Sequence, residues 1–465
     1  MEYASFSELN QHFREKLQDT EVYSTTHHSF LKPFQHALSY AYNRVDTKLI
    51  AHRFHLPLWL LRVLFYLKSF MAASAPKPRL KRFVVLEGGR YVTTKEGKTI
   101  SSYFDKILRV LPHGEVTTLL SSHDTPLDYV DIDLKTLNGL RNRPLSARSC
   151  AMFRDIVQVL DKARKSGQFT DYELQHIASQ LHVFFEDFRF FDQLLTGSEV
   201  KVFLFENHYH REGMIAAIQA HNARAVEIQH GLIARNDLYY VYDDYVKPIA
   251  AKAFFPDHLL TFGAYWRDLV LEGAEHPASH VHCVGDYTSF SFDAHPEIRK
   301  EKILFITSQK NMASDYIQYI RHLADLRKKL HNEWKILVKL HPAEPQSHLY
   351  HEAFDDDPQV DLVGSEVDLH EAFAKCSIHL SIYSTTLFDA IGHDLINVSL
   401  QQFSPSADYA RDMVSDRIAH PIEFSDDPFA LVAEELPQTL RERSELYDTF
   451  NEERFLEILT GHRGM

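Results

Sequence analysis

Short runs of apolar residues alternate with segments of amphipathic pattern along most of the chain. The first series of apolar runs covers residues 82–87, 200–205, 223–229, 258–262 and 280–284, and glycine or polar residues follow each run. Uninterrupted apolar runs of this length are typical of strands buried in a parallel sheet with helices on both faces. Because residues 211–221 have a helical pattern between two of the runs, the series predicts a doubly wound α/β domain.

A second series of the same kind begins near residue 300. It predicts strands at 302–306, 335–340, 360–363 and 378–382, and helices at 315–330, at 369–374 and from Thr385 onward. Two such blocks predict an α/β protein of two Rossmann-like, doubly wound domains that face a cleft. Ligands of such domains bind beyond the carboxyl ends of the strands, so the residues that follow each strand are the candidates for chemistry.

Both ends of the chain have a helical pattern. The first 78 residues end in Ala-Ser-Ala-Pro-Lys-Pro, a run that stops a helix. The tail from residue 428 is again helical, and we expect it to pack back on the first domain. The predicted organisation is a helical segment 1–78, a first domain 79–295, a second domain 296–427 and C-terminal helices 428–465.

The composition is that of an ordinary folded protein, since 45% of the 465 residues are hydrophobic and 25% are charged. The net charge of −14 argues against a protein that wraps nucleic acid with its surface. The three cysteines, Cys150, Cys283 and Cys376, fit no metal spacing and suit a reducing cytosol. No secretory signal is visible at the start of the sequence. We therefore expect a cytoplasmic protein without a nucleic-acid partner.

The negative charge is unevenly distributed. Residues 48–86 hold eight basic residues and no acid, a charge of +8, so the rest of the chain carries −22. Within this stretch, residues 56–71 are too few and too charged to span a bilayer of about 30 Å, but they suit an interfacial helix. Two interpretations stay open. In the first, this helix packs on the first domain and its basic face is solvated. In the second, it binds the anionic cytoplasmic face of the inner membrane and holds the protein there peripherally.

The segment 335–344, Lys-Ile-Leu-Val-Lys-Leu-His-Pro-Ala-Glu, combines a buried strand with polar residues at its carboxyl end. The strand delivers Lys339 and His341, and Pro342 ends it, so the imidazole lies on a short loop. Such a histidine can donate a hydrogen bond to a phosphate and favour departure of the leaving group, or it can stabilise a turn. Ser308, which follows the preceding strand, belongs to the same edge of the predicted sheet.

In the segment 376–390 a strand ends in Tyr-Ser-Thr-Thr and a helix follows at once. Hydroxyl groups and free backbone N–H groups meet at such a helix N-terminus, which makes Ser384 and Thr385 candidates for an anion site. Simple N-capping is the alternative, because Ser and Thr are preferred there without any ligand. Asp389, one turn further on, is placed to reach a ribose hydroxyl or to complement the helix dipole.

The first domain also carries polar groups beyond two strand ends. One strand leads into Gln-His-Gly, and another leads into Glu-Asn-His-Tyr-His-Arg. An imidazole suits proton transfer near neutral pH, and glycine permits close approach of a ligand. The candidate residues of this edge are Gln229, His230, Gly231, Glu206, His208 and Arg211. Each of them also suits a purely structural role.

The arrangement of these motifs resembles a known family. A strand ending in His341-Pro342, and a later strand ending in Ser384-Thr385, are similar to the nucleotide-binding domain of bacterial surface-polysaccharide transferases of GT-B architecture. These include the Kdo transferases of capsule and lipopolysaccharide synthesis, sialyl- and polysialyltransferases, and CDP-glycerol glycerophosphotransferases. The resemblance implies that His341 contacts the donor phosphate and that Ser384 and Thr385 bind the same group.

The resemblance also implies how the two domains divide the work. The second domain would hold a nucleotide-activated donor, with a CMP-linked sugar such as Kdo or sialic acid favoured, and the first domain a glycan or lipid-linked acceptor. The Gln-His-Gly element looks like one in related polymer-forming enzymes, where the histidine is a candidate base. The acidic pair followed by Gly that sialyltransferases use has no convincing copy, and Arg211-Glu212-Gly213 is the nearest. The base therefore stays open among His230, Glu206 and Glu212.

The expected activity is that of a metal-independent glycosyltransferase that needs no cofactor beyond its nucleotide-activated donor, and no residue is assigned to a metal. Three alternatives stay open: a CDP-polyol phosphotransferase, a nucleotide-sugar epimerase and a non-catalytic scaffold for glycan or membrane. An epimerase would interconvert one nucleotide sugar without an acceptor. A scaffold would not be stabilised by nucleotides.

Overall fold

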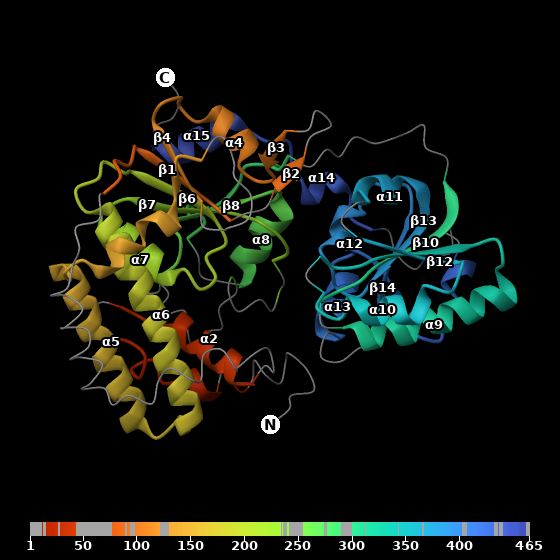
Figure 1. The fold of residues 1–465 in the computed structure, drawn as a ribbon, viewed down its shortest axis with the longest axis horizontal. Helices are drawn as coiled ribbons and strands as arrows, with labels where there is room; N and C mark the ends of the chain where they lie inside the picture. Colours follow the sequence, from red (N-terminus) through yellow and green to blue (C-terminus); the bar gives the residue numbers. More distant parts are fainter. Residues whose placement is uncertain are drawn as a thin grey trace. The chain divides into compact units, whose positions relative to one another are not determined.

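The computed structural model describes residues 12, 15–26, 28–42, 77–88, 91–93, 98–120, 130–233, 235, 240, 254–273, 277–289, 300–310, 312–342, 344–364, 367–401, 407–431, 436 and 440–461. None of the helices in these ranges is long and apolar enough to cross a membrane. The chain divides into two compact units (Figure 1). Beyond residue 10, unit 1 comprises Gln11–Phe290 and Tyr447–Met465, and unit 2 comprises Ser291–Leu446. The boundary predicted at 295/296 lies outside the described residues, and so does most of the basic stretch 48–86, including 56–71.

Unit 1 is built on a parallel sheet whose seven described strands follow the order β5-β4-β1-β6-β7-β8-β9. The strands are β1 Phe83–Glu87, β4 Val116–Leu120, β5 Ile132–Asp133, β6 Val202–Glu206, β7 Arg224–Ile228, β8 His258–Thr261 and β9 Val281–Cys283. The chain adds β4 and β5 on one side of β1 and returns to the other side with β6. The switch point of this doubly wound sheet therefore lies between β1 and β6, and ligands of such sheets bind at the switch point.

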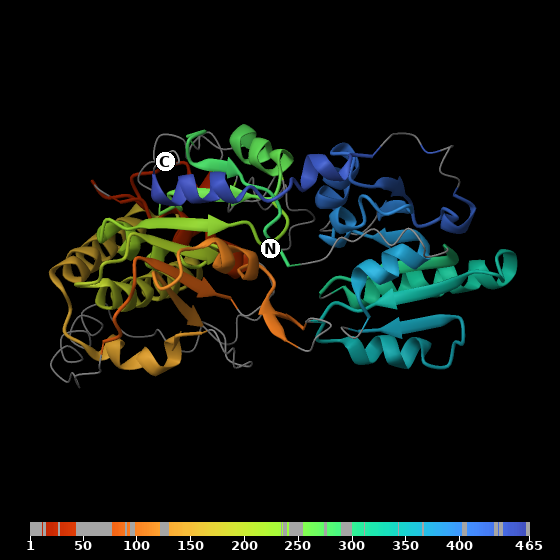
Figure 2. The same ribbon diagram turned by 90° about the horizontal axis from the view of Figure 1, so that it is seen from above.

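Helices cover both faces of this sheet. The described helices are α2 Leu31–Tyr42, α4 Asp105–Val110, the 3-10 helix η2 Leu134–Asn142, α5 Ala147–Ser166, α6 Asp171–Leu195, α7 Glu212–Ala220, α8 Ala264–Gly273 and α15 Glu452–Thr460, and a small hairpin joins β2 Tyr91–Thr93 to β3 Thr99–Ser101. α6 and α7 lie on one face, and α15 lies on the other (Figures 1 and 2). Gly213 allows the close approach of α7 to α6, because a Cβ there would lie 2.1 Å from the Phe184 carbonyl oxygen.

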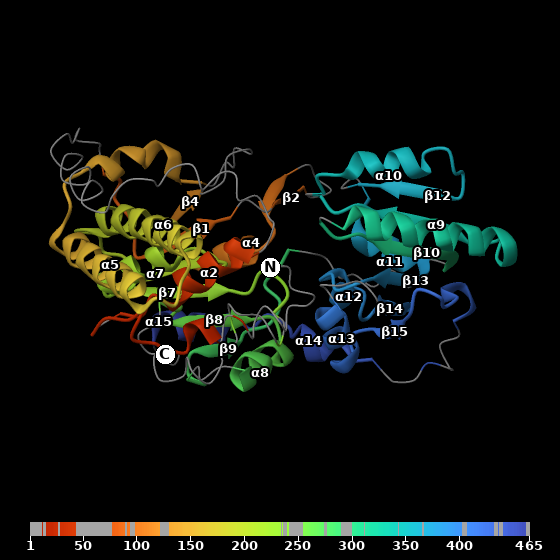
Figure 3. The ribbon, with the colours of Figure 1, turned by 90° about the horizontal axis from the view of Figure 1, so that it is seen from below.

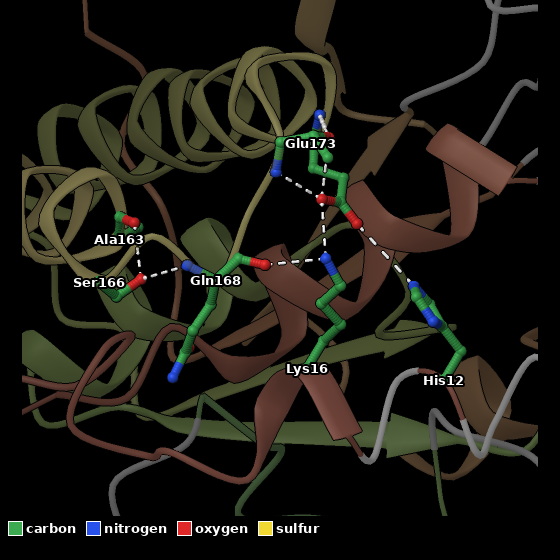
Figure 4. Close-up of polar contacts among 7 residues, drawn as sticks. His12, Lys16, Ala163, Ser166, Gln168 and Glu173 are labelled. Carbon is green, nitrogen blue, oxygen red and sulfur yellow. Dashed lines mark hydrogen bonds and ion pairs between the residues drawn. The ribbon is translucent and has the colours of Figure 1, made fainter.

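The N-terminal residues are fixed to the start of α6 by one buried carboxylate (Figure 4). Glu173, whose side chain is 1% exposed, accepts a hydrogen bond from Lys16 Nζ at 3.1 Å, and His12 Nε2 lies 3.9 Å from its other oxygen. Lys16 also donates to the Gln168 carbonyl at 2.8 Å. Glu173 forms a capping box with Thr170 at the helix start. The described residues before position 43 therefore belong to unit 1, whereas the sequence predicted a separate helical segment 1–78.

Unit 2 is built on a second parallel sheet, with the described strand order β12-β11-β10-β13-β14-β15. Its strands are β10 Glu301–Thr307, β11 Lys335–Lys339, β12 Val360–Val363, β13 Cys376–Ser381, β14 Ile396–Leu400 and β15 His420–Ile422. Its helices are α9 Ala313–Leu330, α10 Ser347–Phe354, α11 Leu369–Lys375, α12 Thr386–Asp389, α13 Ala407–Ser415, η4 Pro428–Ala430 and α14 Arg443–Leu446. α10 packs beside β12 and α9 (Figure 3). The chain leaves β10 toward β11 and β12 and returns with β13, so the switch point lies between β10 and β13. The two doubly wound, Rossmann-like sheets confirm the predicted fold class.

The C-terminal segment differs from the prediction. Residues up to Leu446 belong to unit 2, and only the segment from Tyr447 onward belongs to unit 1. Phe429 explains the first part, because its ring packs 5.5 Å from that of Trp334 in the core of unit 2. The second part is held to unit 1 by Asn451, which comes just before α15. Its N–H donates to the carbonyl of Val284, the residue after β9, at a distance of 2.8 Å. The predicted helical tail 428–465 is therefore shared between the two units.

Candidate functional site

The carboxyl ends of β10, β11 and β13 bring together the residues predicted for the second domain. β10 pairs with both other strands. Because neighbouring strands are about 4.8 Å apart, the ends of β11 and β13 are about 10 Å apart. The residues that follow these strands are Ser308 after β10, His341 and Pro342 after β11, and Ser384 and Thr385 after β13. The topology thus places them along one edge of one sheet, beside its switch point.

Ser308 holds the start of the loop that carries His341. The Ser308 N–H donates to the Lys339 carbonyl at 3.0 Å, and the Ser308 Oγ accepts from the His341 N–H at 3.0 Å. Ser308 is buried, whereas His341 and Pro342 are exposed. His341 is therefore exposed, while the hydrogen bond to Ser308 fixes its backbone amide.

Lys339 makes contacts that the sequence did not predict. Its Nζ donates to the carbonyls of Gly364 and Val367, the latter at 2.8 Å. Both carbonyls lie in the connection between β12 and α11, so the ammonium group closes that loop. Two of the three donors of the Lys339 ammonium group therefore hold this loop of unit 2.

The helix that follows β13 begins beside its predicted start at Thr385, and it is short. α12 has four residues, and a single turn aligns too few peptide dipoles to form an anion site by itself. Ser384 Oγ accepts from the Thr386 N–H at 3.3 Å, and Asp389 is the last residue of the helix. Thr385 is exposed and Ser384 is half-buried. Both residues remain candidates through their hydroxyl groups, and the helix dipole is not part of the site.

A buried chain of hydrogen bonds connects the start of α12 to the middle of the sheet. Thr386 Oγ1 lies 2.7 Å from Thr307 Oγ1, which lies 3.0 Å from His379 Nε2. His379 Nδ1 lies 2.7 Å from Asn397 Oδ1, and Asn397 Nδ2 donates to two backbone carbonyls. Because those two bonds fix Oδ1 as an acceptor, Nδ1 carries the imidazole proton and Nε2 accepts from Thr307. This directional chain positions the loop that precedes α12.

The burial of His379 predicts that unit 2 loses stability in mild acid. Burial lowers the pKa of His379 to about 4, against 6.5 for a free imidazole. As the pH falls, the unfolded chain binds the proton first, so the free energy of unfolding should fall between pH 6.5 and pH 4. This one group accounts for up to about 3 kcal/mol of that loss.

Trp334 offers a reporter for this test because it is buried in unit 2, whereas Trp266 is buried in unit 1. Urea unfolding would be followed by Trp334 fluorescence in a Trp59→Phe, Trp266→Phe background at several pH values. The His379→Gln variant should show a flatter pH dependence than its parent over this range. Equal slopes in the two proteins would contradict the assignment of the loss to His379.

In unit 1, two glutamates end the strands on either side of the switch point. Glu87 ends β1 and Glu206 ends β6, and both are buried. Ser101 Oγ donates to Glu87 at 2.8 Å, and the Gly88 N–H donates to Glu206 at 2.7 Å. A Cβ at Gly88 would lie 2.1 Å from the Glu206 carboxylate, so this contact requires glycine. Burial and the two carboxylates together raise the pKa of the Tyr91 phenol, which keeps it a hydrogen-bond donor at neutral pH.

His208 has a buried partner that the sequence did not reveal. His208 Nδ1 lies 2.6 Å from Glu227 Oε2, and the Tyr240 hydroxyl donates to Glu227 Oε1 at 2.7 Å. All three side chains are buried. His208 therefore ties the loop after β6 to β7, and it does not line an open edge as predicted.

The backbone on both sides of His230 is fixed, while its side chain is half-buried. Gln229 is buried, and its Nε2 donates to the Gly231 carbonyl at 2.9 Å, while its Oε1 accepts from the first backbone N–H after β8 at 3.0 Å. The Tyr103 hydroxyl donates to the His230 carbonyl at 2.5 Å, and the Tyr209 ring lies 5.6 Å from the imidazole. Gln229 and Gly231 are thus positioning residues, and His230 is the candidate base that solvent can reach.

The third candidate base, Glu212, lies in a different environment. It is the first residue of α7, it is buried, and its Oε1 lies 3.6 Å from His36 Nε2 of α2. Burial raises the pKa of Glu212 to about 7 and lowers the pKa of His36 well below its usual value. Glu212 is therefore buried against α2, where solvent does not reach it. In the loop before it, Asn207 and His210 have left-handed backbone angles, φ 80° and 59°, which is a strain often found near functional sites.

Comparisons with known proteins give backbone similarities alone. No protein-family model matches the chain, and no curated protein matches it. Similar solved structures include the UDP-GlcNAc 2-epimerase from Methanocaldococcus jannaschii, with 9% identity, a TM-score of 0.47 and coverage of 82% of this chain and 99% of that chain. A putative UDP-N-acetylglucosamine 2-epimerase from Listeria monocytogenes has 10% identity, a TM-score of 0.48 and coverage of 82% and 96%. A trehalose-6-phosphate protein from E. coli bound with UDP-2-fluoro glucose has 11% identity, a TM-score of 0.41 and coverage of 75% and 89%.

Proposed function

We propose that the protein binds a nucleotide-activated sugar through unit 2 and transfers the sugar to a glycan or lipid-linked acceptor without a metal ion. The observation that carries this proposal is the polar edge at the switch point of unit 2. There the exposed residues His341 and Thr385 and the half-buried Ser384 follow two strands that flank β10. Doubly wound sheets bind nucleotides at such an edge.

The dimensions of this edge suit a phosphate-containing ligand. A span of about 10 Å between the ends of β11 and β13 allows contacts at several points along a sugar–phosphate chain. In this proposal His341 donates a hydrogen bond to a phosphate oxygen and stabilises the negative charge that develops on the departing nucleotide. The hydroxyl groups of Ser384 and Thr385 contact the same phosphate, and Asp389 is the candidate for a ribose hydroxyl.

Unit 1 supplies the base, and we assign this role to His230. Its half-buried imidazole, at the carboxyl end of β7, suits the removal of a proton from an acceptor hydroxyl near neutral pH. Glu206 is the alternative, because it ends the strand beside the switch point. Glu212 is set aside because it is buried against His36 of α2.

For the donor we propose a CMP-linked acidic sugar such as Kdo or sialic acid, and for the acceptor a bacterial surface polysaccharide. The His-Pro and Ser-Thr motifs support this choice through their resemblance to transferases of that class. We further propose a cytoplasmic protein that residues 48–86 hold at an anionic membrane surface. The charge of +8 in that stretch supports this contact.

A thermal-shift panel with CMP, CDP and UDP tests the proposed binding. A nucleotide present at 100 times its dissociation constant should stabilise the protein by about 2.7 kcal/mol and raise its melting temperature. Stabilisation by CMP would support an acidic-sugar donor, CDP would favour the polyol phosphotransferase, and UDP would favour a hexose donor. A melting temperature that none of the three changes would contradict nucleotide binding and favour the scaffold.

Product analysis then separates transfer from epimerisation. The stabilising nucleotide would be supplied as its sugar conjugate, with and without a glycan acceptor. A transferase releases nucleotide in step with acceptor modification, whereas an epimerase yields an isomeric nucleotide sugar and needs no acceptor. Formation of the isomer without an acceptor would replace the proposed reaction with epimerisation.

A further inference from the structure

A pocket of about 310 Å³ opens on unit 1 beside the switch point of its sheet. Its walls come from β1, from η2, from α6 and from the start of α7. The residues proposed for the nucleotide belong to unit 2, whereas the residues that line this pocket belong to unit 1. Its volume is at the lower end of small-molecule sites, about 300–1,000 Å³, which suits one sugar-sized group better than a complete nucleotide sugar.

The polar lining of this pocket is predominantly cationic. It contains Lys135, Arg141 and Arg211 and one acid, Asp187. Arg141 and Asp187 largely neutralise each other, since their closest side-chain atoms are 3.6 Å apart. The Lys135 side chain has neither a hydrogen bond nor an ion pair among the described residues. The Arg211 guanidinium makes no such direct contact there, but it interacts electrostatically with the carboxylates of Glu206, Asp187 and Glu227. The lining residues thus have a net formal charge of +2, with three cations against one acid, and a half-buried guanidinium can add a charge-assisted contact to an anion.

The apolar lining supplies a wall for the body of a ligand. Phe190 and Phe191 are buried, and their rings meet edge to face at a centroid distance of 5.1 Å. Arg141 lies 5.2 Å from the Phe190 ring, which holds its guanidinium at that wall. Asn138 is exposed at the pocket and offers both a donor and an acceptor for a ligand hydroxyl. A mostly apolar wall with a few polar groups is typical of a small-molecule site.

We propose that this pocket binds an anionic sugar, with its carboxylate or phosphate at Lys135 and Arg211 and its ring against Phe190 and Phe191. The ligand class follows from the excess positive charge, the aromatic wall and the volume. This inference goes beyond the proposed function, because it concerns a second ligand site whose occupancy requires no nucleotide.

Calorimetric titration of the full chain tests the inference, using glucuronate, glucose 6-phosphate, glucose and inorganic phosphate as probes without nucleotide. At least one of the two anionic sugars should bind, at least about tenfold more tightly than glucose and than inorganic phosphate, and binding should weaken with added salt. Glucuronate and glucose 6-phosphate separate a carboxylate from a phosphate preference. The proposal would be overturned if glucose or inorganic phosphate bound as tightly as the anionic sugars. It would also be overturned if neither anionic sugar bound at 10 mM, about the weakest affinity that would still indicate a built site.

Variants locate the binding site. Lys135→Gln should weaken anionic-sugar binding about fivefold and Arg211→Met about tenfold or more, because each removes a charge-assisted contact. Lys135 is exposed, so its variant should fold like the parent even if the Arg211 variant does not. Lys201→Gln, an exposed lysine at the amino end of β6, is the matched control and should leave the affinity unchanged. Unchanged affinity in Lys135→Gln, or an equal loss in the control, would overturn the assignment to this pocket.

Discussion

Replacement of His341 by alanine should lower the turnover number of the nucleotide-sugar reaction at least about 100-fold. In the proposed mechanism this imidazole donates the hydrogen bond that stabilises charge on the departing nucleotide, and loss of one such donor costs roughly 3 kcal/mol in the transition state. The donor KM should change less, because Ser384 and Thr385 still contact the phosphate. Steady-state release of nucleotide, measured with the donor that the thermal-shift panel identifies, would give both constants.

The matched control is His348→Ala. His348 is an exposed histidine on α10, close in sequence to His341 but outside the polar edge. Its replacement should leave turnover near the parent value. Near-normal turnover in the His341 variant, or a similar loss in both variants, would remove the phosphate role from His341.

Replacement of His230 by asparagine should lower kcat/KM by about 10² to 10⁴, the range attributed to general acid–base catalysis. The pH profile makes this test specific for a base. The parent should lose activity in acid as the imidazole becomes protonated, and the variant should lack that acid limb. The measurement is kcat/KM for the acceptor between pH 5 and pH 9, a range about the unperturbed imidazole pKa.

Two further variants make the base assignment decisive. His113→Asn changes an exposed histidine in the turn before β4, at the amino edge of the same sheet, and should leave the profile unchanged. Glu206→Gln should reduce activity but keep the acid limb. If the limb persisted in His230→Asn and vanished in Glu206→Gln, Glu206 would be the base.

The sequence predicted the strands that lie in largely apolar runs and missed the strands β2, β3, β4, β5, β14 and β15. β1 and β6 have every residue buried, which produces the pattern that was recognised. β14 is Ile-Asn-Val-Ser-Leu, and its polar residues are buried in hydrogen-bond networks that only the fold reveals. β5 has two residues and β15 has three, too short to produce a pattern. Fold class was thus predictable, whereas one edge of each sheet was not, the edge at β5 in unit 1 and the edge at β15 in unit 2.

The candidate site was predictable as a set of strand ends but not as a set of contacts. His341, Ser384 and Thr385 follow recognisable strands, so topology alone brings them to one edge. Lys339 and His208 also lie at or just after strand ends. In the structure, however, Lys339 donates to backbone carbonyls and His208 contacts Glu227. These partners lie far from Lys339 and His208 in the sequence, so no local pattern reveals them.

Some of these partners left a visible trace in the sequence. Glu87 and Glu227 are the single acids of the largely apolar strands β1 and β7, and a buried carboxylate requires a hydrogen-bond donor. Tyr240, the donor to Glu227, comes from a segment without any periodic pattern. The acid could therefore have been suspected from the sequence, but its tyrosine partner could not.

The most direct test of nucleotide binding by unit 2 is amide hydrogen exchange of the full chain, with and without the nucleotide that raises its melting temperature. We expect slower exchange in the segments 307–309, 339–342 and 383–389, which are the strand ends and loops at the polar edge of unit 2. The exposed turn around His113, in unit 1, should exchange equally in both samples. Protection confined to unit 1, or no change at those three segments when the nucleotide is saturating, would contradict the central claim.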